Sequence, residues 1–176
     1  SSKVMMEPTF KNISIIGLGL IGTSILHAIK TKSKKEIITY AYDTNSEHRD
    51  TVLEMGIATF VCDNIHDAVK EADLVILAIP VGSMKILATA IGPSLKKGAI
   101  VTDTGSTKSS VIKDVNPFIP KNVVFIPSHP IAGTEYSGPK SGFGSLFENR
   151  YWLIICEKET HHTKNLTIFF QNLGSI

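Results

Sequence analysis

Short apolar runs recur along the chain, and between them apolar residues return at intervals of three and four. The runs are rich in β-branched residues and do not alternate with polar ones, which is typical of strands buried on both faces of a sheet. The intervening spacing is typical of amphipathic helices. Strands are predicted at 12–17, 36–43, 58–62, 72–80, 98–103, 122–127 and 150–156. Helices are predicted over 20–31, 46–56, 65–72, 83–95, 106–115 and 157–176.

Strands and helices alternate throughout, and this order indicates an α/β fold with a doubly wound, mostly parallel sheet of the Rossmann type. We expect residues 1–176 to form one dinucleotide-binding domain. Ser46 and Ser106 are the expected N-caps of the second and fifth helices, and Gly56 ends the second. The segment from Pro127 to Asn149 is predicted to be a long loop, and loops of that length in compact domains are commonly functional.

Composition and charge exclude several classes of partner. The net charge of +2 and the absence of a basic stripe argue against nucleic acid. No apolar run approaches the roughly 18 residues of a membrane span. The N-terminal segment lacks the features of a secretory signal, so a cytoplasmic location is expected. Cys62 and Cys156 form no CxxC pair, although a single disulfide between them stays open, and no histidine pair has metal-ligand spacing, so no metal is assigned.

The stretch GLGLIG places Gly17, Gly19 and Gly22 at the spacing of a dinucleotide-binding turn, after the first strand and at the start of the first helix. Asp43 ends the second strand 21 positions after Gly22, where a carboxylate accepts hydrogen bonds from the adenosine ribose. That charge favours NAD over NADP, and an inward-turned Arg49 would weaken the preference. The alternative is a glycine turn followed by an aspartate that caps the next helix.

Ligands of doubly wound sheets lie beyond the carboxyl ends of the strands. The segments there include Ala78–Ser83, Asp103–Lys108 and the loop that begins at Ser128, and these should surround the nicotinamide end. The predicted cofactor-binding residues are Gly17, Leu18, Gly19, Leu20, Ile21, Gly22, Asp43, Ala78, Ile79, Pro80, Ser83, Thr104 and Gly105.

His129 follows the sixth predicted strand at this same edge, and Pro130 restricts its backbone to extended geometry. A dehydrogenase that oxidises an alcohol needs a base for the hydroxyl proton, and imidazole suits that task near neutral pH. Ser106 is placed to orient the imidazole or to contact substrate; otherwise it is only a helix cap. Surface positions are expected for the remaining histidines, which are His27, His48, His66, His161 and His162.

Four segments together, GLGLIG, DTGSTK, HPIAGTEYSGP and FENRYWLI, resemble the prephenate and arogenate dehydrogenase family of tyrosine biosynthesis, in the same order between Lys11 and Trp152. The resemblance implies NAD(P)-dependent oxidative decarboxylation of prephenate to 4-hydroxyphenylpyruvate, or of arogenate to tyrosine. It also implies that His129 deprotonates the ring hydroxyl, that Ser106 contacts it, and that Glu135 gates or orders the substrate pocket.

The family normally continues into a helical domain that dimerises and closes the substrate site, and this domain is expected after Ile176. The only arginines, Arg49 and Arg150, have other expected places, so the guanidinium that would hold a substrate carboxylate is missing. We therefore expect this chain to bind NAD but to turn over poorly alone, and the full-length protein to be a homodimer. The last helix is expected to expose an apolar face.

Two other functions stay open at this point. The first is another oxidoreductase of the wider 6-phosphogluconate-dehydrogenase-like group, in which a lysine would occupy the catalytic position; only Lys108 is a candidate. The second is a non-catalytic NAD-binding module, which would account for the glycines but would give His129, Ser106 and Glu135 no task.

Overall fold

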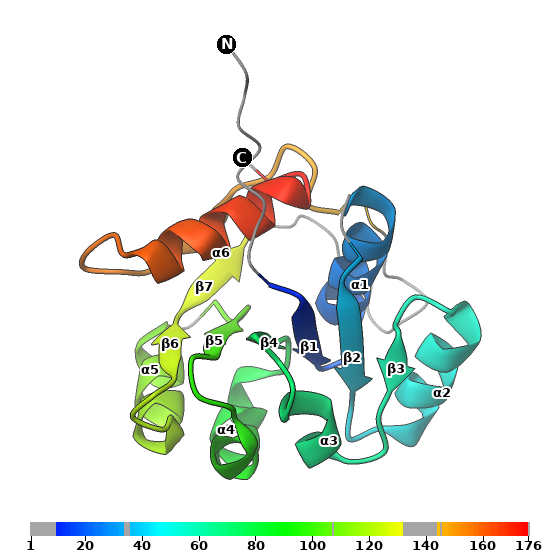
Figure 1. The fold of residues 1–176 in the computed structure, drawn as a ribbon, viewed down its shortest axis with the longest axis horizontal. Helices are drawn as coiled ribbons and strands as arrows, with labels where there is room; N and C mark the ends of the chain where they lie inside the picture. The colour runs from blue at the N-terminus through cyan, green and yellow to red at the C-terminus, as the bar shows by residue number, and fades with distance from the viewer. Residues whose placement is uncertain (1–9, 34–35, 107, 132–143, 145, 176) are drawn as a thin grey trace.

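The computed structural model describes residues 10–33, 36–106, 108–131, 144 and 146–175. Its centre is a six-stranded parallel sheet in the order β3-β2-β1-β4-β5-β6 (Figure 1), which confirms the predicted α/β fold. These strands are β1 (Asn12–Ile16), β2 (Ile38–Tyr42), β3 (Phe60–Val61), β4 (Leu74–Leu77), β5 (Ile100–Asp103) and β6 (Val124–Ile126). The order reverses between β1 and β4, where a doubly wound sheet has its ligand crevice.

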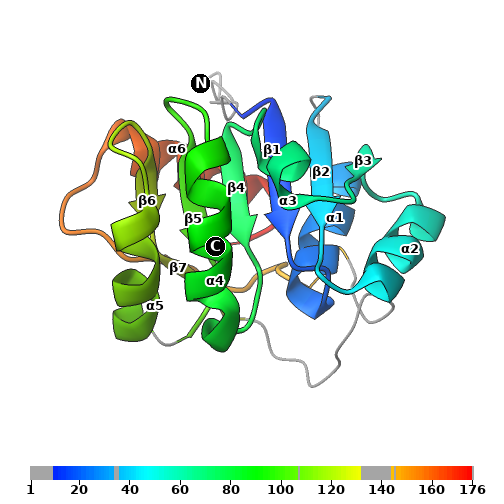
Figure 2. The same ribbon diagram turned by 90° about the horizontal axis from the view of Figure 1, so that it is seen from below.

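Helices cover both faces of the sheet, as Figures 1 and 2 show. The helices are α1 (Leu20–Lys32), α2 (Ser46–Met55), α3 (Ile65–Val69), α4 (Met84–Ile91), α5 (Lys108–Val115) and α6 (His161–Asn172), with single 3₁₀ turns at Val81–Ser83, Gly92–Ser94 and Asn116–Phe118. One hydrophobic cluster joins α1, α2 and α6 to the sheet, and the other joins α3, α4 and α5 to its opposite face. Neighbouring residues of one strand enter opposite clusters, as Ile15 and Ile16 do, which explains the continuous apolar runs.

The residues after β6 depart from the prediction. Ser128–Pro130 form a short strand, β7, rather than the first part of a loop, and β7 pairs antiparallel with β8 (Trp152–Ile154) in a separate two-stranded sheet. The strand predicted at 150–156 therefore exists but lies outside the main sheet. This three-residue strand contains a proline and a histidine and has no apolar pattern that would predict it. It forms because it pairs with residues more than twenty positions away in the sequence.

One predicted helix cap is wrong. The N-cap of α2 is Asn45 and not Ser46, because the Asn45 side chain accepts hydrogen bonds from the backbone N–H groups of Glu47 and His48. The cap predicted at Ser106 adjoins residue 107, which lies outside the described residues, and stays a prediction. Gly56 ends α2 as predicted.

The expectation that α6 exposes its apolar face is wrong. The helix buries Leu166, Phe169 and Phe170 in the first cluster, and Ile168 is half-buried. Trp152 of β8 stacks on Phe170 with ring centroids 3.7 Å apart and planes inclined by 11°. The final helix is thus a structural part of this domain. No helix in the described ranges is both long and apolar enough to span a bilayer.

Candidate functional site

A cleft of about 830 Å³ lies at the carboxyl ends of the parallel strands. It gathers the turn between β1 and α1, the residue after β2, the segments after β4 and β5, and one residue of β7. Thirteen predicted site residues line it: Gly17, Gly19, Leu20, Ile21, Asp43, Ala78, Ile79, Pro80, Ser83, Thr104, Gly105, Ser106 and His129. The tertiary structure therefore brings together side chains that are spread over more than a hundred positions.

Two of the predicted residues do not line the cleft, and a third is not described. Leu18 is fully buried in the core, and it meets the site only through its backbone. Gly22 is buried in the first turn of α1. Glu135 lies outside the described residues.

The three glycines of the turn differ in what the fold demands of them. Gly17 has a φ of +103°, and a Cβ there would lie 2.1 Å from the Ala78 carbonyl oxygen. A Cβ on Gly22 would lie 1.8 Å from the Gly17 carbonyl oxygen, so both positions exclude any side chain. A Cβ on Gly19, in contrast, would meet nothing within 4 Å. Because the protein itself leaves that space open at the start of α1, the missing side chain at Gly19 fits close approach by a ligand.

Asp43 organises the part of the cleft beside the glycine turn. Its Oδ2 accepts a hydrogen bond of 2.8 Å from the backbone N–H of Leu18, and its Oδ1 accepts one of 2.9 Å from that of Asn45. The capping alternative for Asp43 is wrong, because Asn45 caps α2 and the Asp43 carboxylate instead faces the glycine turn. Arg49 donates to the Asp43 carbonyl oxygen at 2.7 Å.

His48 is a site residue that the sequence analysis missed. It lies at the surface as expected, but it also lines the cleft, and its Nδ1 lies 3.2 Å from the Asp43 Oδ2. Its position in the sequence could have indicated this place. His48 lies in the first turn of a helix that begins three residues after Asp43, and that turn faces the Asp43 carboxylate. The other lining residues outside the prediction are Ile16, Tyr42, Thr44, Val81, Ile86 and Leu87.

His129 is half-buried at the opposite end of the cleft. Its Nδ1 lies 3.2 Å from the carbonyl oxygen of Thr104, the first residue after β5. A carbonyl oxygen only accepts hydrogen bonds, so this contact places a hydrogen on Nδ1, and in the neutral ring Nε2 then carries the lone pair. Ser106 lines the same cleft and is exposed.

Lys108, the candidate base of the lysine alternative, is engaged elsewhere. Its Nζ lies 2.5 Å from Oδ2 of the fully buried Asp103, and it also donates to the carbonyl oxygen of Ser128. Burial lowers the pKa of the Lys108 ammonium, against the opposing effect of the Asp103 carboxylate. Lys108 does not line the cleft.

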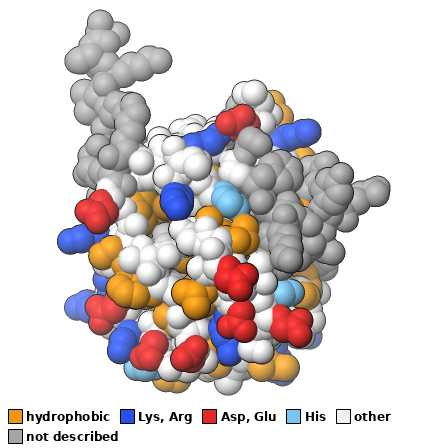
Figure 3. Space-filling view, turned by 90° about the vertical axis from the view of Figure 1, so that its right-hand side faces the viewer, with side chains coloured by type: hydrophobic (Ala, Val, Ile, Leu, Met, Phe, Trp, Pro, Cys, Tyr) orange, Lys and Arg blue, Asp and Glu red, His pale blue; other side chains and the backbone are white. Residues whose placement is uncertain are grey.

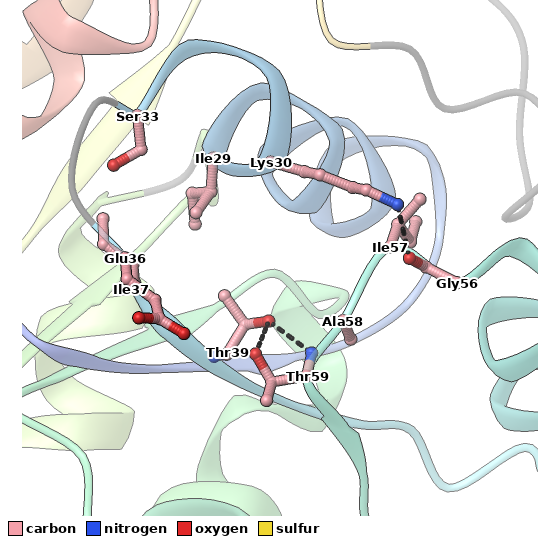
Figure 4. A pocket seen from close by; sticks show the side chains of 10 residues that line it. All are labelled: Ile29, Lys30, Ser33, Glu36, Ile37, Thr39, Gly56, Ile57, Ala58 and Thr59. Atoms are coloured by element: carbon pink, nitrogen blue, oxygen red, sulfur yellow. Dashed lines mark hydrogen bonds between the residues drawn. The ribbon is translucent and has the colours of Figure 1, made fainter.

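A second cavity, of about 340 Å³, lies between the end of α1, the start of β2 and the residues after α2 (Figure 4). Lys30 donates to the Gly56 carbonyl oxygen at 2.7 Å, and Thr39 and Thr59 bond each other through backbone and hydroxyl groups. These polar groups have partners within the protein, so we assign no ligand to the cavity. Acidic, basic and apolar side chains all occur on the face in Figure 3, and no cluster of three metal-ligating side chains is found among the described residues.

A parallel sheet with its crevice at the order reversal, a glycine turn and an acid after β2 define a nucleotide-binding domain of the oxidoreductase type. The chain belongs to the prephenate dehydrogenase family, because the model of that family's nucleotide-binding domain matches residues 26–175. This membership confirms the family resemblance drawn from the sequence motifs.

Individual relatives agree with the family assignment. Over 151 residues the chain is 46% identical to the cyclohexadienyl dehydrogenase of Zymomonas mobilis, and the match covers 86% of this chain and 51% of the relative. It is 37% identical to the prephenate dehydrogenase of Lactococcus lactis, covering 85% of this chain and 42% of that protein. The crystal structure of Aquifex aeolicus prephenate dehydrogenase with hydroxyphenyl propionate and NAD⁺ superposes with a TM-score of 0.84 at 27% identity, over 94% of this chain and 58% of that one. The chain thus spans about half the length of the curated relatives it matches.

Proposed function

We propose that this chain is the NAD-binding part of a dehydrogenase that oxidatively decarboxylates prephenate, or arogenate, in tyrosine biosynthesis. The observation that carries the proposal is the shared cleft, in which His129 stands at one end and the glycine turn and Asp43 stand at the other. Family membership supports it, as does the NAD⁺ bound to the Aquifex aeolicus relative. The Asp43 carboxylate favours NAD, because it would repel the 2′-phosphate of NADP.

The described residues suit a dinucleotide along the whole cleft. The open space at Gly19 and the unpaired N–H groups at the start of α1 suit the pyrophosphate. Asp43 suits the adenosine ribose, and the segments Ala78–Ser83 and Thr104–Gly105 suit the nicotinamide end. When bound, NAD supplies the hydride acceptor for the reaction.

His129 acts as the general base in this proposal. Its Nε2 takes the proton of the ring hydroxyl as hydride leaves the same carbon, and the Thr104 carbonyl stabilises the resulting imidazolium through Nδ1–H. Loss of carbon dioxide then provides the electron pair that makes the ring aromatic, and the proton returns from Nε2 to the oxygen. Ser106 contacts the hydroxyl, and Glu135, outside the described residues, orders the substrate pocket.

Replacing His129 by asparagine in the full-length protein tests this function. We expect kcat to fall by about 10² to 10⁴ while the Kd for NAD stays unchanged, because the imidazole transfers a proton and does not hold the cofactor. NADH absorbance measures turnover with prephenate and arogenate and with both cofactors. The matched control is His161→Asn, an exposed histidine on α6. Undiminished turnover by His129→Asn would contradict the proposal.

We further propose that residues 1–176 are one domain, and that a second, helical domain completes the substrate site and forms a homodimer. The matches cover only 51% of the Zymomonas mobilis relative and 42% of the Lactococcus lactis one. One face of the β7–β8 pair is apolar and open to solvent, with Tyr151 59%, Leu153 47% and Ile155 44% exposed. Arg49 donates to the Asp43 carbonyl oxygen, and neither Arg49 nor Arg150 lines the cleft, so this proposal takes the guanidinium for the substrate from another part of the protein.

The domain proposal has its own test. We expect the 176-residue chain to bind NAD with an affinity near that of the full-length protein but to lack steady-state turnover of either substrate. Calorimetry measures the first property and NADH absorbance the second. Turnover by the isolated chain at the full-length rate would contradict the need for a second domain. A cytoplasmic location stays a prediction.

A further inference from the structure

Asp103, at the end of β5, carries a carboxylate that is fully buried and is the centre of a polar network. Its Oδ1 accepts a hydrogen bond of 3.0 Å from the backbone N–H of Ser128. Its Oδ2 accepts one of 2.9 Å from the backbone N–H of Gly105 and one of 2.5 Å from the Nζ of Lys108. All these donors come from segments that border the cleft, although the carboxylate itself does not line it.

The network fixes the chain on both sides of the contact between the His129 Nδ1 and the Thr104 carbonyl oxygen. Thr104, whose carbonyl oxygen meets the His129 Nδ1, lies between Asp103 and Gly105 in the chain. His129 directly follows Ser128, whose N–H bonds the same carboxylate. Because one buried carboxylate fixes both segments, it sets the distance between the imidazole and the carbonyl that receives its hydrogen.

Lys108 supplies the charge that this carboxylate needs. A buried carboxylate without a cation is costly, and a paired one must also have its remaining lone pairs satisfied. The Lys108 ammonium meets the first need, and it donates to the Ser128 carbonyl oxygen as well. It thereby ties the strand that carries His129 to the helix that follows the Thr104 turn.

A second set of bonds holds Ser128 from its side chain. The Ser128 Oγ donates to the Asp103 carbonyl oxygen at 2.8 Å and accepts from the Trp152 Nε1 at 3.0 Å. These bonds keep β7 close to β5 whether or not Lys108 is charged. A change confined to Lys108 should therefore leave the fold in place. It should act on His129 through the one bond that it removes from this strand, the bond to the Ser128 carbonyl oxygen.

We propose that Asp103 and Lys108 are positioning residues that hold His129 as the Nδ1–H tautomer and leave Nε2 as its basic nitrogen. The value of that tautomer for catalysis rests on the proposed function, in which Nε2 receives the hydroxyl proton. The tautomer itself is a property of this chain, and it is measurable without substrate.

The first experiment is long-range ¹H–¹⁵N NMR of the histidine rings in the 176-residue chain at about pH 9, where imidazole is neutral. We expect the wild-type His129 to carry its hydrogen on Nδ1. Lys108→Met should abolish that preference, and Lys108→Arg should retain it because the cation remains. Lys113→Met, an exposed lysine on the same helix, is the matched control and should leave the His129 signals unchanged.

The second experiment measures steady-state kinetics of the same variants in the full-length protein. Lys108→Met should lower kcat by about tenfold to 100-fold, the loss expected when a catalytic group is displaced by about 1 Å. The KM for NAD should stay unchanged. A purely structural role would instead lower the amount of folded protein, which the indole signal of Trp152 reports. If Lys108→Met does not fold, Lys108→Gln, which keeps a hydrogen-bond donor without the charge, takes its place.

The outcomes separate this inference from the proposed function. A wild-type His129 protonated on Nε2, or an unchanged tautomer in both the Met and Gln variants, overturns the positioning role. The expected tautomer shift in a full-length protein that oxidises neither substrate supports the positioning role and overturns the proposed function. A tautomer shift together with the loss of kcat supports both.

Discussion

Asp43 has a structural task besides the ligand task proposed for it. Its carboxylate bonds the backbone of Leu18 and of Asn45, and His48 lies 3.2 Å from its Oδ2. A carboxylate offers about four acceptor sites, so the side of Oδ1 away from Asn45 stays available to a ribose hydroxyl. The residue therefore orders the glycine turn and the start of α2 before any cofactor arrives.

Replacing Asp43 by serine should weaken NAD binding by about tenfold, because a charge-assisted hydrogen bond to the ribose is lost. The ratio of NADP to NAD affinity should rise, since the repulsion of a 2′-phosphate disappears. Calorimetric titration with each cofactor measures both effects. Asp50→Ser, on the exposed side of α2, is the control. An unchanged preference for NAD would place the selectivity elsewhere.

The glycine turn shows that one motif can combine two kinds of constraint. Gly17 and Gly22 lack side chains because backbone atoms occupy the space, whereas Gly19 lacks one with nothing from the protein nearby. The fold thus accounts for two of the glycines, and the proposed cofactor would account for the third.

Gly19→Ala and Gly22→Ala should therefore have different effects. The first should leave the free energy of unfolding within about 1 kcal/mol of wild type while reducing NAD affinity severely. The second should destabilise the protein by several kcal/mol, on the order of an overpacked core site. Urea unfolding and NAD titration measure the two properties. A Gly19→Ala protein that binds NAD normally would contradict the placement of the pyrophosphate at this turn.

At the element scale, Asp73 fixes the start of the central strand. Its Oδ2 accepts hydrogen bonds from the backbone N–H groups of Lys11 and Asn12, and its Oδ1 pairs with Lys96 at 2.6 Å. Burial by itself would raise the pKa of Asp73, but the bonds from Lys96 and the two backbone groups outweigh it and hold the pKa below its ordinary value.

Because the folded chain binds this proton less readily than the unfolded chain, the carboxylate stabilises the fold above the unfolded pKa of about 3.9. That stabilisation is lost as the pH falls through the lower folded-state value. Asp73→Asn should therefore cost about 1–2 kcal/mol at pH 7 and progressively less below about pH 4. Urea unfolding across pH measures the difference. A cost that does not depend on pH would contradict the ionic origin.

Across the whole molecule, Trp152 links the last helix to the candidate site. Its ring packs on Phe170 and Phe147, and its Nε1 donates to the Oγ of Ser128, the neighbour of His129. The C-terminal helix therefore supports the strand pair that presents the imidazole, rather than serving only as a surface for another domain.

Trp152→Leu should lower the free energy of unfolding by about 2–4 kcal/mol, because aromatic contact area and the hydrogen bond to the Ser128 hydroxyl are lost. Leu153→Ser, whose side chain lies on the solvent-exposed face of the same strand, should change it by less than about 0.5 kcal/mol. Circular dichroism during urea unfolding follows both variants. Equal effects would show that the Trp152 packing is not what holds β8 in place.

Much of the fold and part of the site could be predicted from sequence patterns. Strands such as 72–80 are recognisable because burial on both faces removes polar residues from them, and Gly17, Gly22 and Asp43 follow from local spacing. The strand at Ser128–Pro130 and the cleft position of His48 were not predicted. The first depends on pairing with a segment distant in sequence, and the second on the direction in which a helix face turns.

The sequence by itself determined the alternation of strands and helices in the main sheet, the glycine turn and the family, because these are local patterns of hydrophobicity and glycine spacing. Only the tertiary structure decided that Lys108 neutralises Asp103 and that the Nδ1 of His129 meets the Thr104 carbonyl. The physical reason is that hydrogen bonds act over about 3 Å, and only the folded chain brings such distant residues that close.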